Sequence, residues 1–513
     1  MNIKYASECL AQLLFLSTAL FLSGSLLTGG TAAAQPLFPI SGQHTAGGPD
    51  AIFFNPAALH GGGDAPRVTI SLPGVQLQGG GGLLNIPVYN QYLTRDRVLT
   101  SALQQEMLND WFPDGRGTTE QAAFDAGISG IGFSYTRERH AFALAQQWRA
   151  IGRVSASRGV LEAGFGGMNA QLFQEQTPID ARFFSAAFMQ VGAAYSARLL
   201  RQEQSFFMNR PLEVYAGLAP VFLLGYQHFD ADIRSTLQIG EDGLVRHGFN
   251  YEIRTHSRLA RQLQDFAAAK AASGPRDNPS LTNFIDSPFS DFSEIAGYGF
   301  GLNAGVHAKV ELPGTFLDAR FFGAGPRELH LAFSATDFGN INFRDDATRV
   351  THSGILEWRG LNLDDDWIDR EFEGNTNNYV TYVLEDSLAS DTYLSYDAAE
   401  VNSSRIELPG RLHFSSRLDV GRMSGQLHFI RGFNNTGLNS RRVAAGTRLG
   451  YRVARWLPLH AGFISGGEYG RQLEGGFGLR FRRFELDLSA STAVKAASYG
   501  SRAGFDLKSR LTF

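Results

Sequence analysis

Cysteine is almost missing from this sequence: its 513 residues contain a single one, Cys9. Lys4 precedes it, an apolar run from Leu10 to Leu27 follows it, and an A-x-A-like site stands at Ala32–Ala34. This order of features is typical of a secretory signal peptide, and we place its cleavage after Ala34. The remaining chain would contain no cysteine, which excludes disulfide bonds and thiolate metal sites in it.

Long apolar runs are also missing beyond residue 34. No stretch approaches the roughly 18 apolar residues that a membrane-spanning helix needs, so strands would have to carry any membrane role. Charged residues make up only 19% of the chain, whereas glycine and phenylalanine are abundant, with 58 and 40 copies. The formal net charge of -4 gives no reason to expect nucleic-acid binding.

The sequence has neither the G-x-S-x-G nor the H-E-x-x-H motif of common hydrolases. The stretch Gly297–Gly301 has the wrong glycine spacing for a nucleotide-binding loop, and it indicates a strand whose glycines leave room beside aromatic residues. We therefore predict that the protein is not an enzyme and that it has no catalytic residue, no metal site and no cofactor.

An acidic connection from Leu361 to Ser403 is the one candidate for cation binding. Its carboxylates are the hard oxygen ligands that Ca²⁺ and Mg²⁺ prefer. The glycine and the final glutamate of an EF-hand loop are missing, however. We interpret the connection as a solvated surface loop. As an alternative, loosely held divalent ions would bridge this loop to lipopolysaccharide.

The last thirteen residues, Ser501–Phe513, alternate apolar and polar side chains. A period of two predicts a strand with one apolar and one charged face. This strand resembles the C-terminal signal of bacterial outer-membrane β-barrels, which the outer-membrane assembly machinery recognises. The resemblance implies a membrane-insertion signal formed by Phe505, Leu507, Leu511 and Phe513.

The same alternation recurs in residues 442–451, 471–482 and 484–494. In a soluble sandwich the polar faces would meet water, whereas in a membrane barrel the apolar faces meet lipid and the charges line the lumen. The signal peptide, the missing cysteines and the terminal Phe513 favour the barrel. We predict an all-β fold, a transmembrane antiparallel β-barrel of about 14 to 16 strands with long loops.

The charged faces of the C-terminal strands supply candidate lumen-lining residues. These are Arg411, His413, Arg417, Arg448, Glu474, Arg480, Asp487, Lys508 and Arg510. Both signs occur on neighbouring strands, so we expect ion pairs between strands. Such pairs would either stiffen the wall or form a polar conduit, unless loops or the N-terminal segment fill the lumen.

Loop length checks the direction of the strands, because turns on the periplasmic side of a barrel are short. With Phe513 in the periplasm, the tight turns at residues 137–139, 421–422, 454–455 and 482–483 all fall on the periplasmic side, and the long 361–403 connection falls outside. The Arg258–Glu294 connection falls on the periplasmic side and breaks the rule. The strand count in the middle of the chain is therefore open by one pair.

Residues 35–60 fit neither a periodic strand nor a long helix. Asn55 and Pro56 are suited to begin a short helix, as its N-cap and its first residue. Together with the alanine and phenylalanines before them, Asn55, Pro56, Ala57, Ala58 and Leu59 resemble the N-terminal segment of the long-chain fatty-acid transporter-like barrels, where it folds into the lumen as a hatch. The alternative is an ordinary capped turn that leads into the first strand.

Two further strands carry a second resemblance. The segments Gly297–Gly305, Leu329–Ser334 and Thr336–Gly339 resemble an uncharacterised family of outer-membrane β-barrels with a domain of unknown function, related to the fatty-acid transporter-like barrels. Members pair a glycine-alternating strand with a strand that ends in an Asp-x-Gly corner. The resemblance implies a fold and a location, and no established substrate.

One pair of residues resembles the active site of an enzyme. His413 and Ser415 resemble the His-x-Ser pair of outer-membrane phospholipase A, which faces lipid. Here Leu412, Phe414 and Ser416 form the lipid face, so His413 and Ser415 turn into the lumen and the geometry argues against a lipase.

We therefore divide the chain into a signal peptide (1–34), a hatch-like segment (35–65) and an outer-membrane β-barrel (66–513). The leading hypothesis is passive transport of a small molecule, with a hydrophobic one as an option. The alternative is a structural, assembly or secretion-partner barrel that transports nothing. Expected partners are outer-membrane lipid, the assembly machinery and a small hydrophobic ligand, with no nucleic acid, and we expect a monomer.

Overall fold

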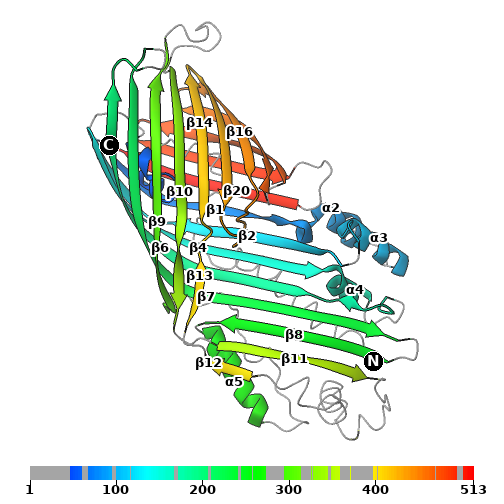
Figure 1. Ribbon diagram of the computed structural model, residues 1–513. Coiled ribbons are helices and arrows are strands. Elements are labelled where there is room, and N and C mark those ends of the chain that lie inside the picture. The colour runs from blue at the N-terminus through cyan, green and yellow to red at the C-terminus, as the bar shows by residue number, and fades with distance from the viewer. Residues whose placement is uncertain are drawn as a thin grey trace.

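Strands dominate the computed structural model of the chain (Figure 1). It describes residues 47–60, 67–94, 100–115, 117–166, 172–205, 209–240, 244–256, 258–272, 294–313, 325, 327–344, 348–358, 370, 397–400, 403–467, 470–493 and 501–513. The proposed signal peptide and nearly all of the acidic 361–403 connection lie outside these residues.

The strands, in chain order, are β1 (Arg67–Gly81), β2 (Thr119–Ser129), β3 (Gly132–Arg137), β4 (His140–Ser157), β5 (Thr177–Pro178), β6 (Ala181–Gln202), β7 (Leu212–Ile239), β8 (Val245–Thr255), β9 (Gly297–Glu311), β10 (Arg327–Phe343), β11 (Thr348–Trp358), β12 (Asp397–Glu400), β13 (Ser404–Glu407), β14 (Arg411–Val420), β15 (Met423–Gly432), β16 (Ala444–Ala454), β17 (Leu457–Gly466), β18 (Arg471–Phe481), β19 (Phe484–Ala493) and β20 (Ser501–Thr512). The α-helices are α2 (Ile86–Val88), α3 (Ser101–Trp111), α4 (Arg158–Gly166) and α5 (Arg258–Ala272). Shorter helical turns are η1 (Pro49–Phe53), η2 (Pro56–His60), η3 (Gly82–Leu84) and η4 (Tyr89–Leu93).

The first and last strands close the sheet into a barrel. β20 pairs antiparallel with β1 from Thr69 and Thr512 at one end to Gly81 and Ser501 at the other. The backbone N–H groups and carbonyls of Val68 and Phe513 extend this pairing to the last residue. Around the ring, β2 with β3 and β13 with β14 each act as one wall strand, which gives a closed antiparallel barrel of 14 strands. The predicted fold class is thereby confirmed.

A side sheet leaves the barrel at the middle of β7. The first half of β7 pairs with β9, up to Gly225 opposite Gly297, whereas the second half pairs with β8, from Phe229 opposite Thr255. β8 in turn pairs with β11, and β11 with β12, so these three strands extend the sheet outside the ring (Figure 1). The prediction that the Arg258–Glu294 connection is on the short-turn side is wrong. Because β8 is not a wall strand, the connection leaves β8 and enters β9 at the opposite end of the barrel.

The register places the short turns at one end of the barrel. The turns after β3, β14, β16 and β18 all lie at the end where Phe513 pairs with Val68, as the loop-length argument predicts. The connections that contain α3, α4 and α5 lie at the other end. We call these the Phe513 end and the loop end.

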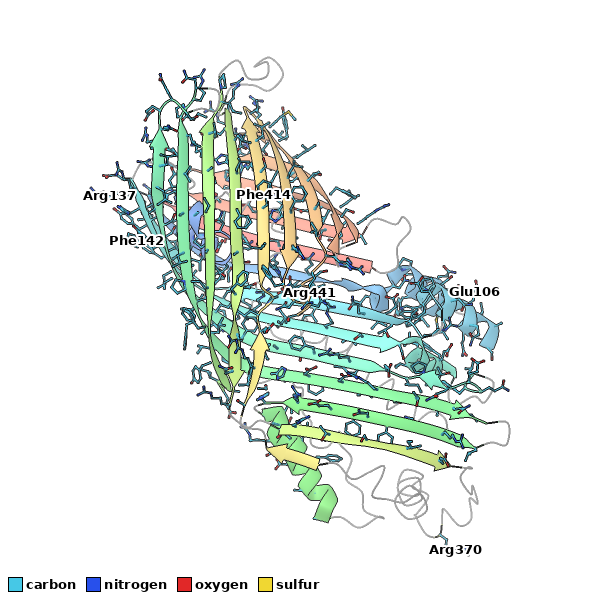
Figure 2. All side chains as sticks on the ribbon, viewed as in Figure 1. Glu106, Arg137, Phe142, Arg370, Phe414 and Arg441 are labelled. Atoms are coloured by element: carbon cyan, nitrogen blue, oxygen red, sulfur yellow. The ribbon has the colours of Figure 1, made fainter. Side chains whose placement is uncertain are left out.

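The wall is inverted relative to a soluble protein. On β10, for example, Leu331 and Phe333 are exposed on the outside, while His330 and Ser334 are buried inside. Exposed aromatic and aliphatic side chains recur in this way on most wall strands (Figure 2). Such a surface matches lipid rather than water. Among the described residues, no helix is long and apolar enough to cross a membrane.

Candidate functional site

Residues 47–60, which we call the inner segment, lie inside the barrel. Two helical turns, η1 and η2, make up most of this segment, and each begins with a proline. Proline suits the first position of a helix because it has no N–H, and an N–H at that position would have no partner within the helix. Every residue from Ala51 to His60 is buried. The four predicted hatch residues Asn55, Pro56, Ala57 and Leu59 are therefore all enclosed by the wall, and their action as a hatch stays a prediction.

Asn55 joins the turn between the two helices to β9. Its Oδ1 accepts a hydrogen bond from the Ala57 backbone N–H (3.1 Å), as an N-cap residue does, and its Nδ2 donates to the carbonyl of Val306 (3.3 Å). Nearby, Asn303 Nδ2 donates to the carbonyl of Ile52 (2.9 Å). Since Asn303 and Val306 are both in β9, that strand holds the centre of the inner segment.

Other wall strands bind the two ends of the inner segment. Thr136 of β3 donates to the carbonyl of Leu59 (3.2 Å), and His60 Nε2 lies 3.3 Å from the carbonyl of Ser196 in β6. At the start of the segment, Arg510 of β20 donates to the carbonyl of Gly47 (2.6 Å). The segment is thus attached to strands on opposite sides of the ring.

Glycines in the wall make room for the inner segment. A β-carbon at Gly305 of β9 would overlap Asn55, one at Gly217 of β7 would overlap the backbone of Pro56 and Ala57, and one at Gly192 of β6 would overlap Ile52. None of these three glycines has a positive φ, so close approach is the reason that they lack a side chain.

The lumen has one apolar side, and the inner segment covers it. Ile52, Phe53, Phe54 and Leu59 form a hydrophobic core with small and aliphatic residues on the inner faces of the strands from β4 to β10. The wall contributes Ala141, Ala143 and Ala145 from β4, Ala186, Phe188 and Ala194 from β6, and Ala219, Val221 and Leu223 from β7. Burial of this apolar surface is the main stabilisation that the segment gains.

A buried ion cluster crosses the lumen beside the inner segment. Arg149 of β4 donates from Nε and Nη2 to both carboxylate oxygens of Asp125 (3.0 and 2.7 Å) and from Nη1 to Asp337 of β10 (2.7 Å). All three side chains are at most 2% exposed. Because β6, β7 and β9 separate β4 from β10 in the ring, the cluster ties together two parts of the wall that are not neighbours.

Asp337 also connects this cluster to the inner segment. Its backbone N–H donates to Asn303 Oδ1 (2.7 Å), and Asn303 in turn donates to Ile52. Asp337 has a φ of 57°, and the β9–β10 register shifts between Ala335 and Phe338. The Asp-x-Gly corner that we expected at the end of a strand is therefore a bulge within β10, which continues to Phe343.

The connection between β15 and β16 enters the lumen from the loop end. Arg153 of β4 donates from Nε to the Gly437 carbonyl (3.0 Å) and from Nη2 to those of Gly437 (2.7 Å) and Asn439 (3.1 Å). Asn439 also accepts a hydrogen bond from Arg411 Nε (3.1 Å). Sequence patterns did not identify Arg149, Asp125 or Arg153, because their partners are far away along the chain.

All nine candidate lumen-lining residues lie on the inner side of their strands. Two of the pairs join neighbouring strands as expected, Arg480 with Asp487 (2.7 Å) and Arg510 with Glu485, whereas Arg417 pairs with Asp419 of its own strand (3.0 Å). Lys508 lies 3.4 Å from Asp506, and its Nζ stands 5.2 Å from the Phe54 ring centroid. Glu474 lies 3.5 Å from His460, and Arg448 faces Gln426 across the β15–β16 pair. Any role in conduction stays a prediction.

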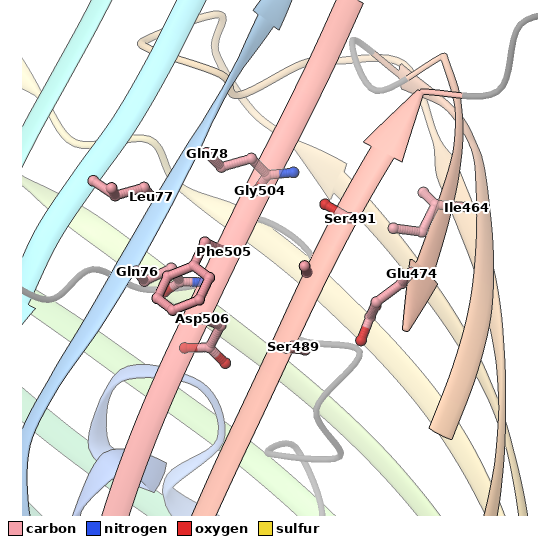
Figure 3. A pocket seen from close by; sticks show the side chains of 11 residues that line it. Gln76, Leu77, Gln78, Ile464, Glu474, Ser489, Ser491, Gly504, Phe505 and Asp506 are labelled. Atoms are coloured by element: carbon pink, nitrogen blue, oxygen red, sulfur yellow. The ribbon is translucent and has the colours of Figure 1, made fainter. Parts of the chain in front are cut away.

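A small cavity of about 30 Å³ lies on this polar side (Figure 3). Gln76, Glu474, Ser489 and Asp506 line it from four neighbouring strands. A cavity of that size has room for about one water molecule. His413 and Ser415 are also buried inside the barrel, as predicted, and therefore do not face lipid.

Of the four residues predicted to form the insertion signal, two are clearly exposed on the outer face. Phe505 and Phe513 are 37% and 53% exposed, and the Arg483 guanidinium lies 5.4 Å from the Phe513 ring centroid. Leu507 and Leu511 share their face of β20 and are half-buried. Their recognition by an assembly machinery stays a prediction.

Solved structures of several outer-membrane barrels resemble the chain distantly. The toluene transporter TodX of Pseudomonas putida is 10% identical over 91% of this chain and 93% of that one, with a TM-score of 0.40. A FadL homologue of Pseudomonas aeruginosa is 12% identical over 94% and 99%, with a TM-score of 0.38. The outer membrane protease OmpT of Escherichia coli is 7% identical over 88% and 97%, with a TM-score of 0.21. Likenesses this distant transfer neither ligand nor activity.

None of the curated protein sequences compared with the chain matches it significantly. A family profile, in contrast, matches residues 67–486, which run from the first residue of β1 into β19. Because this match covers most of the barrel, the chain belongs to the family of unknown function DUF5723.

Proposed function

We propose that the protein spans the outer membrane and lets a small hydrophobic molecule pass, with the inner segment as a hatch. The observation that carries this proposal is the apolar side of the lumen. When the inner segment moves away, the alanine-rich inner faces of β4, β6 and β7 line a path that suits an apolar molecule.

The way in which the inner segment is attached supports a hatch. Beside its apolar contacts it is held by separate hydrogen bonds, among them those from Asn303, Thr136 and Arg510, and none of these three is part of a continuous strand pairing. Separate bonds of this kind break one at a time, whereas a strand in the wall must give up its whole ladder. The segment can therefore leave while the barrel stays closed.

The outer surface supports the membrane location. Phe142, Phe222, Phe333 and Phe429 are exposed on four different wall strands, while the side chains next to them in sequence point inward. In water such a surface would promote aggregation, and in a bilayer it meets acyl chains. The location in the outer membrane, with export by the cleaved segment 1–34, is part of this proposal.

Transport is tested by reconstitution in liposomes. The wild type and a variant that lacks residues 35–62 are compared for uptake of toluene-sized apolar molecules and for ionic conductance. We expect larger fluxes for the deletion variant, because the apolar side of the lumen is uncovered. Equal, background-level flux for both proteins, each shown to be a folded barrel by its heat-dependent gel shift, would reject transport.

The buried ion cluster favours a second candidate, a barrel that transports nothing and presents its loops to a partner. Arg149, Asp125 and Asp337 cross the lumen without exposed side chains, and a permanent crosslink of this kind keeps a barrel shut. The liposome comparison separates the two: the second candidate predicts no flux in either protein.

A further inference from the structure

A groove of about 480 Å³ lies on the outer surface at the Phe513 end. Its lining consists of Tyr135, Arg137, Glu138, His140, Phe142 and Tyr195, from β3, β4, β6 and the turn between β3 and β4. Figure 2 shows Arg137 and Phe142 together on the side of the molecule where the C-terminus lies, away from Glu106 of α3. Neither the inner segment nor the lumen takes part in this groove.

The part of the groove away from the turn between β3 and β4 is aromatic. Phe142 and Tyr195 are 52% and 44% exposed, and their ring centroids are 5.1 Å apart. His140 Nδ1 lies 2.7 Å from the Tyr195 hydroxyl, which fixes the outer edge of the tyrosine at the level of the turn. Aromatic rings with one polar edge are typical of the boundary between acyl chains and headgroups.

The part of the groove next to the turn between β3 and β4 is basic. Arg137 and Glu138 line this part, and Arg139 follows them in the turn, next to the lining; all three residues are exposed. Arg137 and Glu138 are 3.6 Å apart, with side chains 63% and 71% exposed, so this pair holds the guanidinium only weakly. A guanidinium at this position can donate two parallel hydrogen bonds to a phosphate.

The groove belongs to a wider ring of positive charge at the same end. Among the described residues there, nine exposed arginines stand against three exposed glutamates, Glu138, Glu203 and Glu311. The arginines are Arg137, Arg139, Arg201, Arg210, Arg422, Arg452, Arg455, Arg482 and Arg483. The exposed rings of Trp456, Phe481 and Phe513 lie at the same end. An excess of this size attracts an anionic surface.

We propose that this groove binds an anionic glycerophospholipid of the adjoining leaflet, with the phosphate at Arg137 and Arg139 and an acyl chain along Phe142 and Tyr195. The inference rests on the proposed membrane location and is independent of transport. Charge complementarity selects the occupant. The aromatic part of the groove alone would accept any lipid, whereas the arginine pair favours a headgroup with a net negative charge.

The test uses the full barrel in nanodiscs of phosphatidylcholine alone, with added phosphatidylglycerol, or with added lipid A, followed by native mass spectrometry of the lipids that stay bound. For the wild type we expect roughly thirtyfold preferential retention of phosphatidylglycerol over phosphatidylcholine, on the scale of two basic residues near an anionic surface. The preference should shrink in 1 M salt, where charges are screened within about 3 Å.

Matched variants locate the site. The double variant R137Q/R139Q should lose the preference, R137K/R139K should keep most of it, and R441Q/R442Q, with two exposed arginines at the loop end, should equal the wild type. A wild type without preference, or a preference that survives in R137Q/R139Q, would overturn the proposal. The proposal would also be overturned if the wild type retained lipid A and not phosphatidylglycerol, and if R137Q/R139Q lost this retention.

The outcome separates the lipid site from the proposed location. A protein that forms no heat-modifiable barrel in phosphatidylcholine nanodiscs would overturn both. A protein that inserts and shows no phosphatidylglycerol preference would overturn the lipid site alone and leave the membrane location standing.

Discussion

Asn303 holds Ile52 of the inner segment through a hydrogen bond of 2.9 Å from its Nδ2 to the Ile52 carbonyl. The same side chain accepts a hydrogen bond from the backbone of Asp337, whose carboxylate receives Arg149. One asparagine therefore couples the inner segment to the ion cluster that crosses the lumen.

The first prediction concerns this coupling. The substitution Asn303→Ala leaves the Ile52 carbonyl and the Asp337 N–H buried without partners, at a cost of roughly 2 to 4 kcal/mol. We expect the inner segment to detach more often, seen as faster protease cleavage within residues 47–60 of the reconstituted protein. Asn340→Ala, on the neighbouring strand, is the control. Cleavage rates that are equal in the two variants would contradict the coupling.

The second prediction concerns the ion cluster. Arg149→Met leaves the buried Asp337 without its cation and leaves Asp125 only the more distant Arg411, at 3.6 Å. The variant should lower the free energy of unfolding in urea by about 3 to 5 kcal/mol. Arg149→Lys should lose less, because it keeps the charge without the bidentate geometry.

Arg182→Gln is the control for this experiment, because Arg182 is 59% exposed and its 3.7 Å pair with Asp230 should contribute at most about 1 kcal/mol. If Arg149→Met were as mild as the control, the cluster would not stabilise the barrel.

The third prediction concerns the room that the glycines provide. A β-carbon in Gly305→Ala overlaps the Asn55 side chain, so we expect the inner segment to shift and the conductance of the barrel to rise, while its heat-dependent gel shift stays unchanged. Gly425→Ala serves as the control, since its β-carbon would meet nothing closer than Leu449 Cδ2 at 3.9 Å. A silent Gly305→Ala variant would show that the contact does not hold the segment in place.

The fourth prediction concerns the end of the chain. Phe513 exchanges backbone hydrogen bonds with Val68 (2.8 and 3.1 Å), and these remain in Phe513→Ala, whereas deletion of residue 513 removes them. If the aromatic ring serves as an insertion signal, Phe513→Ala should already lower the amount of barrel in the outer membrane. The purified variant should still refold in detergent. Normal membrane levels for Phe513→Ala, with a loss only on deletion, would assign the role to the backbone pairing instead.

Much of the wall could be predicted from local pattern. The inward direction of His413, Glu474 and Lys508 follows from alternation along single strands, because successive side chains of a strand point to opposite faces. The turn positions followed from the same argument once Phe513 was placed at one end. The middle of the chain could not be read in this way, because the pattern of β8 resembles that of a wall strand although β8 pairs outside the ring.

The contents of the lumen were predictable only in part. The short helix after Asn55 followed from its capping residue and proline, but no local signal says which wall residues receive it. The glycines at positions 192, 217 and 305 have a common purpose only once β6, β7 and β9 surround the inner segment.

By itself, the sequence determined a strand-built chain with an apolar and a polar face, because the period of two is a property of each strand and needs no partner. Only the tertiary structure decided that the ring closes with 14 strands, that residues 47–60 fill its apolar side and that Arg149 reaches Asp337. Those two residues are 188 positions apart, and closure of the barrel is what brings them to 2.7 Å.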